Sequence, residues 1–557
     1  MNHSEITSTD KPGPEPIQVD SVGVVEQGET VEETSDSHIP DASMLEDRFP
    51  EWAQMSRSAA LWTTIVGFIY AVLNYHRLWY TDLWGHLAYG RVIVESKSIP
   101  ATEPLLPLCE GMPFFDTAWL SQVLSYLMYE QFGVTSLRFL YALALTICVV
   151  AMLVRFRQKT NSYGLSLIGL AVFGFVAWKT LSIIRPQIAG FTCFVLVWTL
   201  VSCHKWTKWH WGLVPAIFLV WANLHGSFPV GLGLIGLLWI GKTADQFIRT
   251  KRMGAWASLR YFVMLELCLL AVLINPYGIG IFSAIHSISG NPNLSTLVEW
   301  EPLTLRMAHG QAMVIVGVLL IILHNYSPRR VSISEFLILI VFAIAGMWSV
   351  RMVVWWTPLA ALSVVIHGQA ILKRYTNWNS ETQHEPHRSG LNTVVALGMS
   401  WIFFAYTPFG ATLLHGYPQE PEKALDFYRS NLSSQTPVLL ANYLNEHEPD
   451  GLIFNTYEWG DYLLWTGPQD RQLFLNSHAH LVPRDVWLDY FVIARANLGW
   501  EDKIDRYGAN TVVIDKLYHS RLLEALKRNS DWKLDYEDEL GAIFFRRNPI
   551  LTGPIIK

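Results

Sequence analysis

The chain has 557 residues, of which 51% are hydrophobic and only 16% are charged, and its formal net charge at pH 7 is −6. Soluble domains carry about 25% charged residues, so this composition argues against a soluble enzyme and indicates a polytopic membrane protein. The small negative charge gives no support to a nucleic-acid partner. The five cysteines are scattered without a CxxC pair, which argues against disulfides and against a cysteine-based structural zinc site.

Residues 1–57 form the first predicted region, an acidic tail that we place in the cytoplasm. Residues 1–50 are rich in Ser, Thr, Glu, Asp and Pro and contain few aromatic residues. Such a segment cannot bury enough apolar surface to offset the entropy of ordering it, so we predict disorder. It also lacks a basic segment followed directly by an apolar stretch, and we do not interpret it as a signal peptide.

Apolar runs recur through residues 58–410, and about eleven of them approach the length of roughly 17–25 residues that a membrane-spanning helix needs. We expect these helices near residues 59–78, 136–154, 163–183, 188–203, 211–224, 227–243, 260–275, 311–325, 333–349, 352–372 and 391–409. Basic clusters occupy alternate connections, and the positive-inside rule makes that side the cytoplasm. The motifs with concentrated polar side chains fall in the other connections, which we therefore place on the extracytoplasmic face.

The first outer connection, residues 79–135, has the densest polar chemistry. It opens with the run WYTDLWGHLAYGR, in which Asp82, His86 and Tyr89 are spaced i, i+4, i+7. If this run is helical, the three side chains share one face, and an ionisable pair at a membrane boundary is by default a functional-site hypothesis. Two other interpretations stay open: Asp82 caps the helix that follows, or Asp82 and His86 bind a divalent cation.

The later outer connections each contribute one or two candidate residues. Arg185 and Arg351 fall at the outer ends of predicted helices, where the phosphate of a lipid would lie, and the guanidinium fork matches phosphate oxygens. Arg185 alternatively extends its side chain only to the membrane interface. Glu299 and His225 occupy two further outer connections.

The final region, residues 411–557, turns soluble and mixed in composition. We expect strands at 451–455, 472–476, 511–515, 532–536 and 542–546, alternating with helices at 421–430, 436–447, 484–495 and 519–529. This alternation predicts an α/β domain, which we place on the extracytoplasmic side. A polar cluster with Asn476, His478, His480 and Asp485 follows one strand; a zinc site through its histidines stays open, but we expect the domain mainly to recognise an acceptor.

Taken in order, these motifs resemble the membrane glycosyltransferases of the GT-C fold. The resemblance runs over about residues 58–550 and is carried by the D-x-W-x-H-L-x-x-G-R run at residues 82–91, then by Ile99-Pro100, Pro113, Trp119-Leu120, Arg185-Pro186-Gln187, Trp221-Ala222-Asn223-Leu224-His225-Gly226 and Tyr457-Glu458-Trp459-Gly460-Asp461-Tyr462-Leu463. It is closest to a largely uncharacterised bacterial branch related to the protein O-mannosyltransferases. Two positions depart from the pattern: Ala118 stands where relatives have an acid, and Asn476-Ser477-His478 replaces an Asp-x-Arg.

This resemblance implies sugar transfer from a polyprenyl-phosphate-linked donor to a glycan, lipid or protein acceptor of the cell envelope, at the outer face of the bacterial inner membrane. It implies Asp82 as the base and Glu299 as a second acid that orients the acceptor or a metal, with Mg²⁺ or Mn²⁺ left open as a cofactor. The residues expected to contact substrate or lipid phosphate are His86, Arg91, Asp116, Arg185, His225 and Arg351. A lipid-linked saccharide transporter (flippase) and a non-catalytic envelope scaffold remain the alternatives.

Overall fold

The computed structural model describes residues 49–251, 256–376, 388–447, 449 and 451–550. The disorder predicted for the N-terminal tail falls almost entirely on residues 1–48, which lie outside the described residues. From Pro50 onward the chain forms one compact unit. The boundary expected at residue 410, between a membrane region and an α/β domain, therefore stays a prediction.

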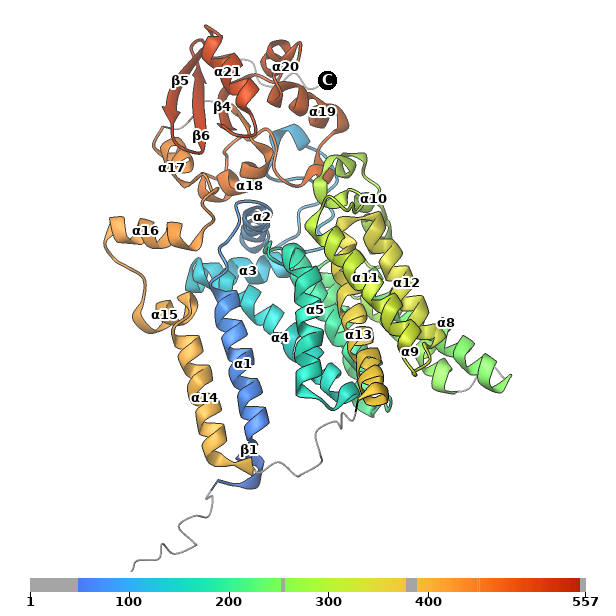
Figure 1. Cartoon of the computed structure of the whole chain (residues 1–557). Coiled ribbons are helices and arrows are strands. Elements are labelled where there is room, and N and C mark those ends of the chain that lie inside the picture. The colour runs from blue at the N-terminus through green and yellow to red at the C-terminus, as the bar shows by residue number, and fades with distance from the viewer. Residues whose placement is uncertain (1–48, 252–255, 377–387, 448, 450, 551–557) are drawn as a thin grey trace, which may run out of the picture. The chain divides into compact units, whose positions relative to one another are not determined.

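A helix is present at every segment that the sequence predicts to span the membrane. These helices are α1 (Arg57–Asn74), α4 (Thr135–Thr160), α5 (Tyr163–Leu181), α6 (Gln187–Val201), α7 (Lys208–Leu224), α8 (Phe228–Thr250), α9 (Trp256–Val272), α11 (Ala308–Tyr326), α12 (Ile333–Trp348), α13 (Val353–Tyr375) and α14 (Gly390–Ala405). Between α9 and α11 lies the shorter α10 (Gly280–Ser289), and many of the long helices run roughly up and down the view in Figure 1.

Fewer than the eleven predicted helices meet the length and hydropathy that a membrane span requires. Four described helices are long and apolar enough to cross a membrane, namely α4, α5, α11 and the helix Val350–Tyr375 that contains α13. A fifth span is possible if α14 and α15 (Pro408–His415), which are bent by 83°, count as one. The protein is thus a helical membrane protein, and the expected number of about eleven spans remains a prediction.

Helix α13 lies at the centre of the helical region. It packs against α5, α11 and α12, and its residues 353–361 are all buried, as expected for a helix that is apolar on every side. Trp355 packs edge-on against two aromatic rings of α6, Phe191 and Phe194, with ring centroids 5.8 and 5.2 Å away. The helix follows directly after the turn η6 (Val350–Met352), so its packing fixes the position of Arg351.

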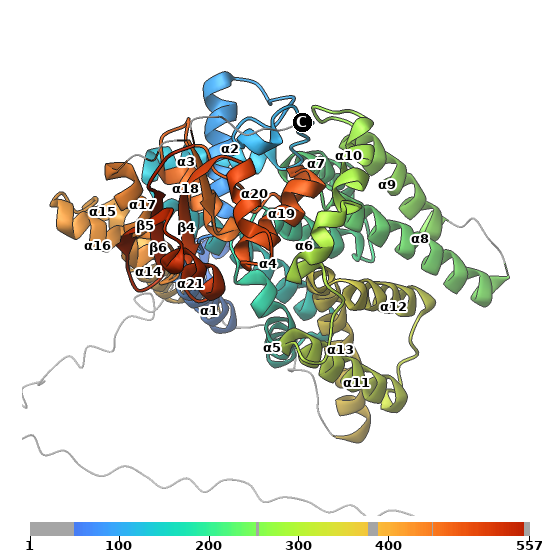
Figure 2. The same ribbon diagram turned by 90° about the horizontal axis from the view of Figure 1, so that it is seen from above.

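Two short helices from the first outer connection lie between the long helices and the C-terminal region in Figure 1, and their labels lie close to that of α18 (Tyr457–Thr466) in the view from above in Figure 2. Helix α2 (Leu83–Ser96) packs against both α3 (Trp119–Phe132) and α18. Gly90 makes the α2–α3 contact close, because a Cβ at this position would lie 2.5 Å from the carbonyl oxygen of Gln122. The helix predicted for the D-x-W-x-H run is therefore present, and it packs against α3 on one side and α18 on another.

The C-terminal region contains a four-stranded sheet with the order β3-β4-β6-β5. The strands of this sheet are β3 (Leu452–Asn455), β4 (Ala509–Asp515), β5 (Trp532–Glu537) and β6 (Gly541–Arg546). Besides α18, the C-terminal region contains the helices α16 (Pro421–Asn431), α17 (Val438–Glu446), α19 (Arg484–Ala494), α20 (Trp500–Arg506) and α21 (Ser520–Arg528). The β3–β4 pair is parallel, whereas β6 runs antiparallel to both β4 and β5.

The strand expected at 472–476 is the one that does not form. Only Leu473 bridges to Ile453 of β3. The N–H of Phe474 still donates to the carbonyl of Ile453 at 2.9 Å. Beyond it, the side-chain amide of Asn455 bonds to Leu475, because its Oδ1 accepts from the Leu475 N–H at 3.4 Å and its Nδ2 donates to the Leu475 carbonyl at 2.8 Å. A buried polar side chain thus satisfies the backbone where the strand ladder would have continued.

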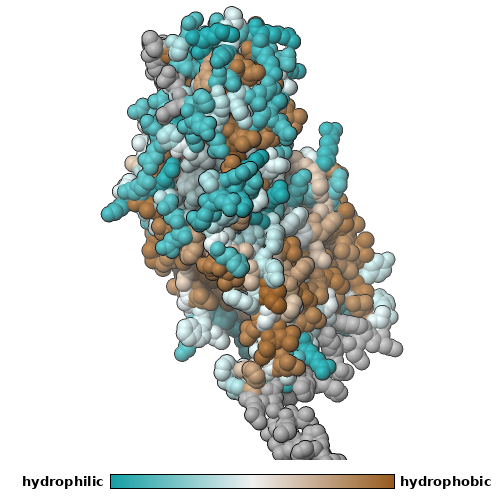
Figure 3. Space-filling model, turned by 90° about the vertical axis from the view of Figure 1, so that its left-hand side faces the viewer, coloured by the Kyte–Doolittle hydropathy of each residue, from teal (hydrophilic) through white to brown (hydrophobic). Residues whose placement is uncertain are grey.

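The surface separates into an apolar and a polar part. In Figure 3, hydrophobic side chains gather over the lower part of the face shown, while hydrophilic side chains cover most of the upper part, where Figure 1 places the sheet. Exposed Leu, Ile, Val and Phe side chains are frequent on the long helices, as at Ile321 and Ile344. Exposed apolar patches of this kind are typical of contact with a membrane or another apolar partner.

Candidate functional site

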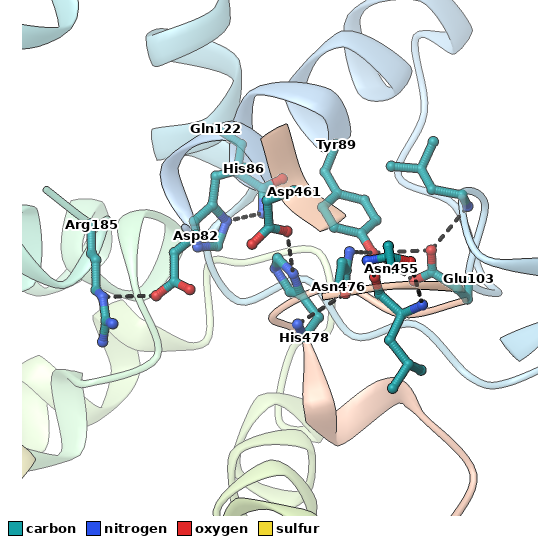
Figure 4. A network of polar contacts seen from close by, with 12 residues as sticks. Asp82, His86, Tyr89, Glu103, Gln122, Arg185, Asn455, Asp461, Asn476 and His478 are labelled. Atoms are coloured by element: carbon teal, nitrogen blue, oxygen red, sulfur yellow. Dashed lines mark hydrogen bonds and ion pairs between the residues drawn. The ribbon is translucent and has the colours of Figure 1, made fainter. Parts of the chain in front are cut away.

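Asp82 occupies the position immediately before α2, but it does not act as a capping residue. Its side chain makes no capping hydrogen bond, and its backbone φ of +26° is unusual for a residue other than glycine. The carboxylate instead faces Arg185, with 2.7 Å between Oδ2 and Nε (Figure 4). Rare backbone conformations of this kind cluster at functional sites, so the capping interpretation is wrong and the functional one is strengthened.

Asp82 begins a continuous series of four alternating charges, which we call the outer ion-pair series: Asp82, Arg185, Glu299 and Arg351. Arg185 also pairs with one oxygen of Glu299, and the other oxygen of Glu299 lies 3.2 Å from a guanidinium nitrogen of Arg351. The side chains are between 18% and 28% exposed, so they remain within reach of a ligand.

Four distant chain segments supply this series. Asp82 precedes α2, Arg185 precedes α6, Glu299 lies in the turn η5 (Val298–Trp300) and Arg351 lies in η6. The guanidinium of Arg351 also stacks over the ring of Trp300, 5.2 Å from its centroid. The structure thus brings together both predicted acids and two of the predicted phosphate-binding residues.

The two carboxylates of the series are matched by its two guanidinium groups. Burial opposes ionisation of Asp82, but the charge of Arg185 and then that of His478 outweigh it and lower the pKa of Asp82 below its usual value. Burial likewise opposes the charge on Arg185, yet Asp82 and Glu299 raise its pKa further. Both groups are therefore charged at neutral pH, and an incoming anion would compete with a carboxylate for the guanidinium groups.

A second group of polar residues adjoins the series along one face of α2 (Figure 4). The rings of His86 and Tyr89 lie 5.0 and 4.8 Å from the ring of His478, which confirms that they share a helix face. The carboxylate of Asp461 in α18 lies 3.8 Å from Nδ1 of His478. Sequence motifs from opposite ends of the chain therefore meet at this point.

The protonation states of the two histidines differ. Burial disfavours the charge on His478, but Asp461 and then Asp82 outweigh it and raise the pKa of His478. Burial, followed by the charge of His478, lowers the pKa of His86 well below its usual value. Burial raises the pKa of Asp461. His478 thus holds its proton more tightly than a free histidine does, next to a neutral His86.

Asp116 and His86 are joined through Gln122 of α3. The Gln122 side-chain amide lies 3.0 Å from Nδ1 of His86 and donates to Asp116 Oδ1 at 3.1 Å. Asp116 is buried, and its Oδ2 has no hydrogen-bond partner among the described residues. Burial raises the pKa of Asp116 to about 7, although the backbone N–H of Ala118 opposes the change.

Two of the predicted contact residues, His225 and Arg91, join neither the outer ion-pair series nor the polar group around His86 and His478. His225 lies within hydrogen-bond distance of its neighbour Ser227, 2.8 Å between Nδ1 and Oγ, and burial followed by the charge of Arg351 lowers its pKa to about 3. Arg91 stacks on Trp465 at 5.0 Å from the ring centroid. His225 is therefore near the series without contacting it, whereas Arg91 supports the α2–α18 contact.

Sequence reasoning missed several members of this site. Tyr89 donates to the Glu103 carboxylate, with 3.0 Å to each oxygen, and no pattern in the sequence singled out Glu103. Asp461 and His478 were visible in their motifs, but nothing in the sequence pairs them with α2. Gly85 shows how close that pairing is, because a Cβ there would lie 2.2 Å from Oδ1 of Asp461.

The two metal-binding interpretations of this region find no third ligand. Across the part of the chain that the structure describes, the group of three His, Cys, Asp or Glu side chains placed to hold one ion is His324, Glu335 and His367. Asp82 with His86, and His478 with His480, each lack such a third partner there. Both interpretations therefore stay predictions without geometric support.

Comparison with solved structures identifies the fold. ArnT from Cupriavidus metallidurans, in the apo state, is 12% identical and has a TM-score of 0.50, with 87% of this chain and 98% of ArnT covered. The archaeal oligosaccharyltransferase AglB from Archaeoglobus fulgidus, in complex with an inhibitory peptide and a dolichol-phosphate, is 12% identical with a TM-score of 0.52, covering 85% of this chain and 72% of AglB. No protein-family model and no curated protein sequence matches the chain. These likenesses confirm the GT-C fold expected from the motifs.

Proposed function

Because the chain has the fold of the GT-C membrane glycosyltransferases, we propose that it transfers a sugar from a polyprenyl-phosphate-linked donor to an acceptor on the extracytoplasmic face of the bacterial inner membrane. The observation that carries this proposal is the outer ion-pair series, in which two acids and two arginines from four segments adjoin one another. The structurally similar AglB was solved with a dolichol-phosphate and an inhibitory peptide, which supports a lipid-linked donor and a separate acceptor.

The two arginines are suited to hold the phosphate of the donor. Arg185 and Arg351 both bind Glu299 from opposite sides, so their guanidinium groups converge on one carboxylate. A phosphate carries the same kind of oxygens with more charge, and guanidinium groups bind it through paired, charge-assisted hydrogen bonds. Exchange of Glu299 for phosphate would place the leaving group next to Asp82.

The transfer step then needs one proton acceptor. An acceptor hydroxyl oxygen attacks the anomeric carbon, the bond from that carbon to the phosphate oxygen breaks, and its electron pair stays on the polyprenyl phosphate. The hydroxyl proton passes to the Asp82 carboxylate, which its low pKa keeps ionised at neutral pH. A weak base is sufficient because positive charge develops on the sugar and makes the attacking hydroxyl acidic in the transition state.

His478 and Asp461 lie close enough to this carboxylate to interact with its charge. His478 lowers the pKa of Asp82 by its charge, so we assign it a positioning role that keeps Asp82 ionised and oriented. The Mg²⁺ or Mn²⁺ that the resemblance leaves open has no part in these steps, since both acids of the series already face a guanidinium group. A divalent cation remains a prediction that the series does not require.

Sugar transfer by the purified protein in nanodiscs tests the proposal. A panel of radiolabelled polyprenyl-phosphate sugars serves as donors and an envelope extract as acceptor, with wild type compared with Asp82→Asn. We expect wild type to transfer from at least one donor and Asp82→Asn to lose at least about 100-fold in rate, while a separate donor-binding assay shows retained binding.

Glu301→Gln is the matched control, because Glu301 is exposed, carries the same charge and lies two residues from Glu299. It should transfer like wild type. Equal transfer by wild type and Asp82→Asn would remove Asp82 from the mechanism. Absence of transfer with every donor would contradict the enzyme and favour a transporter or a scaffold.

A further inference from the structure

A second polar cluster lies on the helices that lead to Arg351, away from the outer ion-pair series. We call His324, Glu335, Ser363 and His367 the inner cluster. His324 lies in the last turn of α11, Glu335 in the first turn of α12, and Ser363 and His367 near the middle of α13. The α11–α12 connection next to it contains Arg329-Arg330, one of the basic connections that predict the cytoplasmic side.

Three of these side chains are placed as a set of metal ligands. His324, Glu335 and His367 each offer one ligand atom, and the three atoms lie within 4.8 Å of one another. Nε2 of His367 is 3.1 Å from Oε1 of Glu335, and the two imidazole rings are 4.5 Å apart. Ligand atoms around a tetrahedral zinc ion are about 3.4 Å apart, given bonds of about 2.1 Å, so small side-chain rotations close the site.

The chemistry of the three ligands selects the kind of metal. Two imidazoles and one carboxylate are typical of zinc and similar divalent transition metals. Magnesium and calcium instead prefer sets made of oxygen ligands. The inner cluster therefore differs in kind from the Mg²⁺ or Mn²⁺ site considered for the outer face.

A hydrogen-bond network is the alternative explanation, and it accounts for only part of the cluster. Ser363 donates to Glu335 at 2.7 Å, and its hydroxyl oxygen lies 2.9 Å from Nε2 of His324. His367 is completely buried, however, and its Nδ1 has no hydrogen-bond partner among the residues that the structure describes. A buried polar atom without a partner costs about 1–3 kcal/mol, so the hydrogen bonds leave one ring nitrogen of His367 unsatisfied, and a metal ion would satisfy it if the ring turned so that Nδ1, in place of Nε2, faced Glu335.

We infer that the inner cluster binds one divalent transition metal ion of the zinc type, with His324, Glu335 and His367 as ligands. The ion would join the last turn of α11 and the first turn of α12 to the middle part of α13. The end of α12 and the start of α13 are connected through η6, which contains Arg351. The bound ion would therefore hold rigid the pair of helices that positions one arginine of the outer ion-pair series.

Cobalt binding to the full-length protein tests this inference without reference to sugar transfer. The protein is purified in detergent through an affinity tag that contains no histidine, treated with EDTA and titrated with Co²⁺. We expect one Co²⁺ per chain with the visible absorption of a tetrahedral site, displacement of Co²⁺ by Zn²⁺, and a Zn²⁺-dependent rise in the unfolding temperature. His324→Ala and Glu335→Gln should each weaken Co²⁺ binding at least tenfold.

His286→Ala is the matched control, since His286 is an exposed histidine at the end of α10, and it should bind Co²⁺ like wild type. Glu335→Gln keeps the size of the side chain and an oxygen that accepts from Ser363, so it carries the test if His324→Ala does not fold. Folded wild type that binds no Co²⁺, or variants that bind it as tightly as wild type, would overturn the inference.

Discussion

Among the single residues of the site, Gly85 sets how closely α2 approaches α18. A Cβ at Gly85 would lie 2.2 Å from Oδ1 of Asp461 and 3.2 Å from Cε1 of His478. Both groups are buried, so neither can move aside without disturbing its neighbours. The space next to this glycine is therefore filled by Asp461 and His478. The charge of His478 acts together with that of Arg185 to keep Asp82 ionised.

We expect Gly85→Ala to destabilise the protein by about 1–3 kcal/mol through overpacking and to reduce sugar transfer. Gly174→Ala is the control, since that glycine lies inside α5 with no atom within 4 Å of an added Cβ. Alanine there should stabilise the helix by up to about 1 kcal/mol. Thermal unfolding of both variants in one detergent measures the difference, and equal unfolding temperatures would disprove the close contact.

Asp116 predicts a pH dependence of stability. Its folded pKa is raised to about 7, mainly by burial, whereas an aspartate in an unfolded chain has a pKa of about 3.9. The folded state therefore favours the neutral form. Its contribution is fully present below the unfolded pKa and is lost as the pH rises toward 7, because the unfolded chain ionises first.

We expect wild type to lose up to about 4 kcal/mol relative to Asp116→Asn between about pH 4 and pH 7, since a tenfold change in proton affinity corresponds to about 1.4 kcal/mol. Asparagine keeps the oxygen that accepts from Ala118 and Gln122 but cannot ionise. The measurement is the difference in unfolding temperature between the two proteins at about pH 5 and about pH 8. A difference that does not change with pH would show that Asp116 has an ordinary pKa.

At the scale of elements, the turn η4 (Pro292–Thr296) holds the C-terminal region against the outer loops. The buried side chain of Asn293 donates to the carbonyl oxygens of Ala479 and Val482, at 2.8 Å each, and accepts from Arg484 at 3.0 Å. These partners surround the turn η7 (Ala479–Leu481), which directly follows His478. One amide thus fixes the segment that carries this histidine.

We expect Asn293→Ala to cost about 2 kcal/mol or more, because it leaves buried carbonyl groups without donors. Hydrogen exchange of peptides covering residues 476–484 should speed up, while the central helix α13 should be unaffected. Ser295→Ala is the control, since its exposed hydroxyl bonds only within its own turn. Unchanged exchange in Asn293→Ala would show that other contacts hold this segment.

The sequence predicted an element correctly where contacts between residues near one another in the chain determine it. Apolar runs of helical length located the long helices, and period and spacing placed His86 and Tyr89 on one face of α2. The strand expected at 472–476 does not form because, from Leu475 onward, the side chain of Asn455, some twenty residues away, takes the place of the ladder. A competing hydrogen-bond partner at that distance leaves no mark in a local pattern.

The same limit applies to the candidate site. Asp82, Arg185, Glu299 and Arg351 were each chosen from the predicted outer connections or the outer ends of predicted helices, and the structure joins them. Their pairing depends on how α5, α6, α12 and α13 pack, which no single segment determines. Asp461 was visible as part of a motif, but its place beside α2 follows from tertiary packing alone.

On the scale of the whole molecule, charge distribution predicts how the protein lies in its membrane. The outer ion-pair series lies where α12 ends and α13 begins, whereas the inner cluster lies at the start of α12 and near the middle of α13. Basic residues gather in the connections at the inner end, where α12 starts, such as Lys205 and Lys208, and Arg329-Arg330. By the positive-inside rule the inner end faces the cytoplasm, and the proposed transfer site then faces outward, where lipid-linked sugars would be used.

Accessibility of single cysteines tests this orientation. Cys203 is half-buried and is replaced by serine, while the other four cysteines are buried. In this background Ser295→Cys, at an exposed position of η4, and His204→Cys, at an exposed position of a basic connection, are treated with a membrane-impermeant maleimide in spheroplasts. We expect Ser295→Cys to react in intact spheroplasts and His204→Cys to react only after detergent is added. The reverse pattern would place the ion-pair series in the cytoplasm, where it would meet nucleotide-activated sugars, and would rule out the proposed outward-facing transfer.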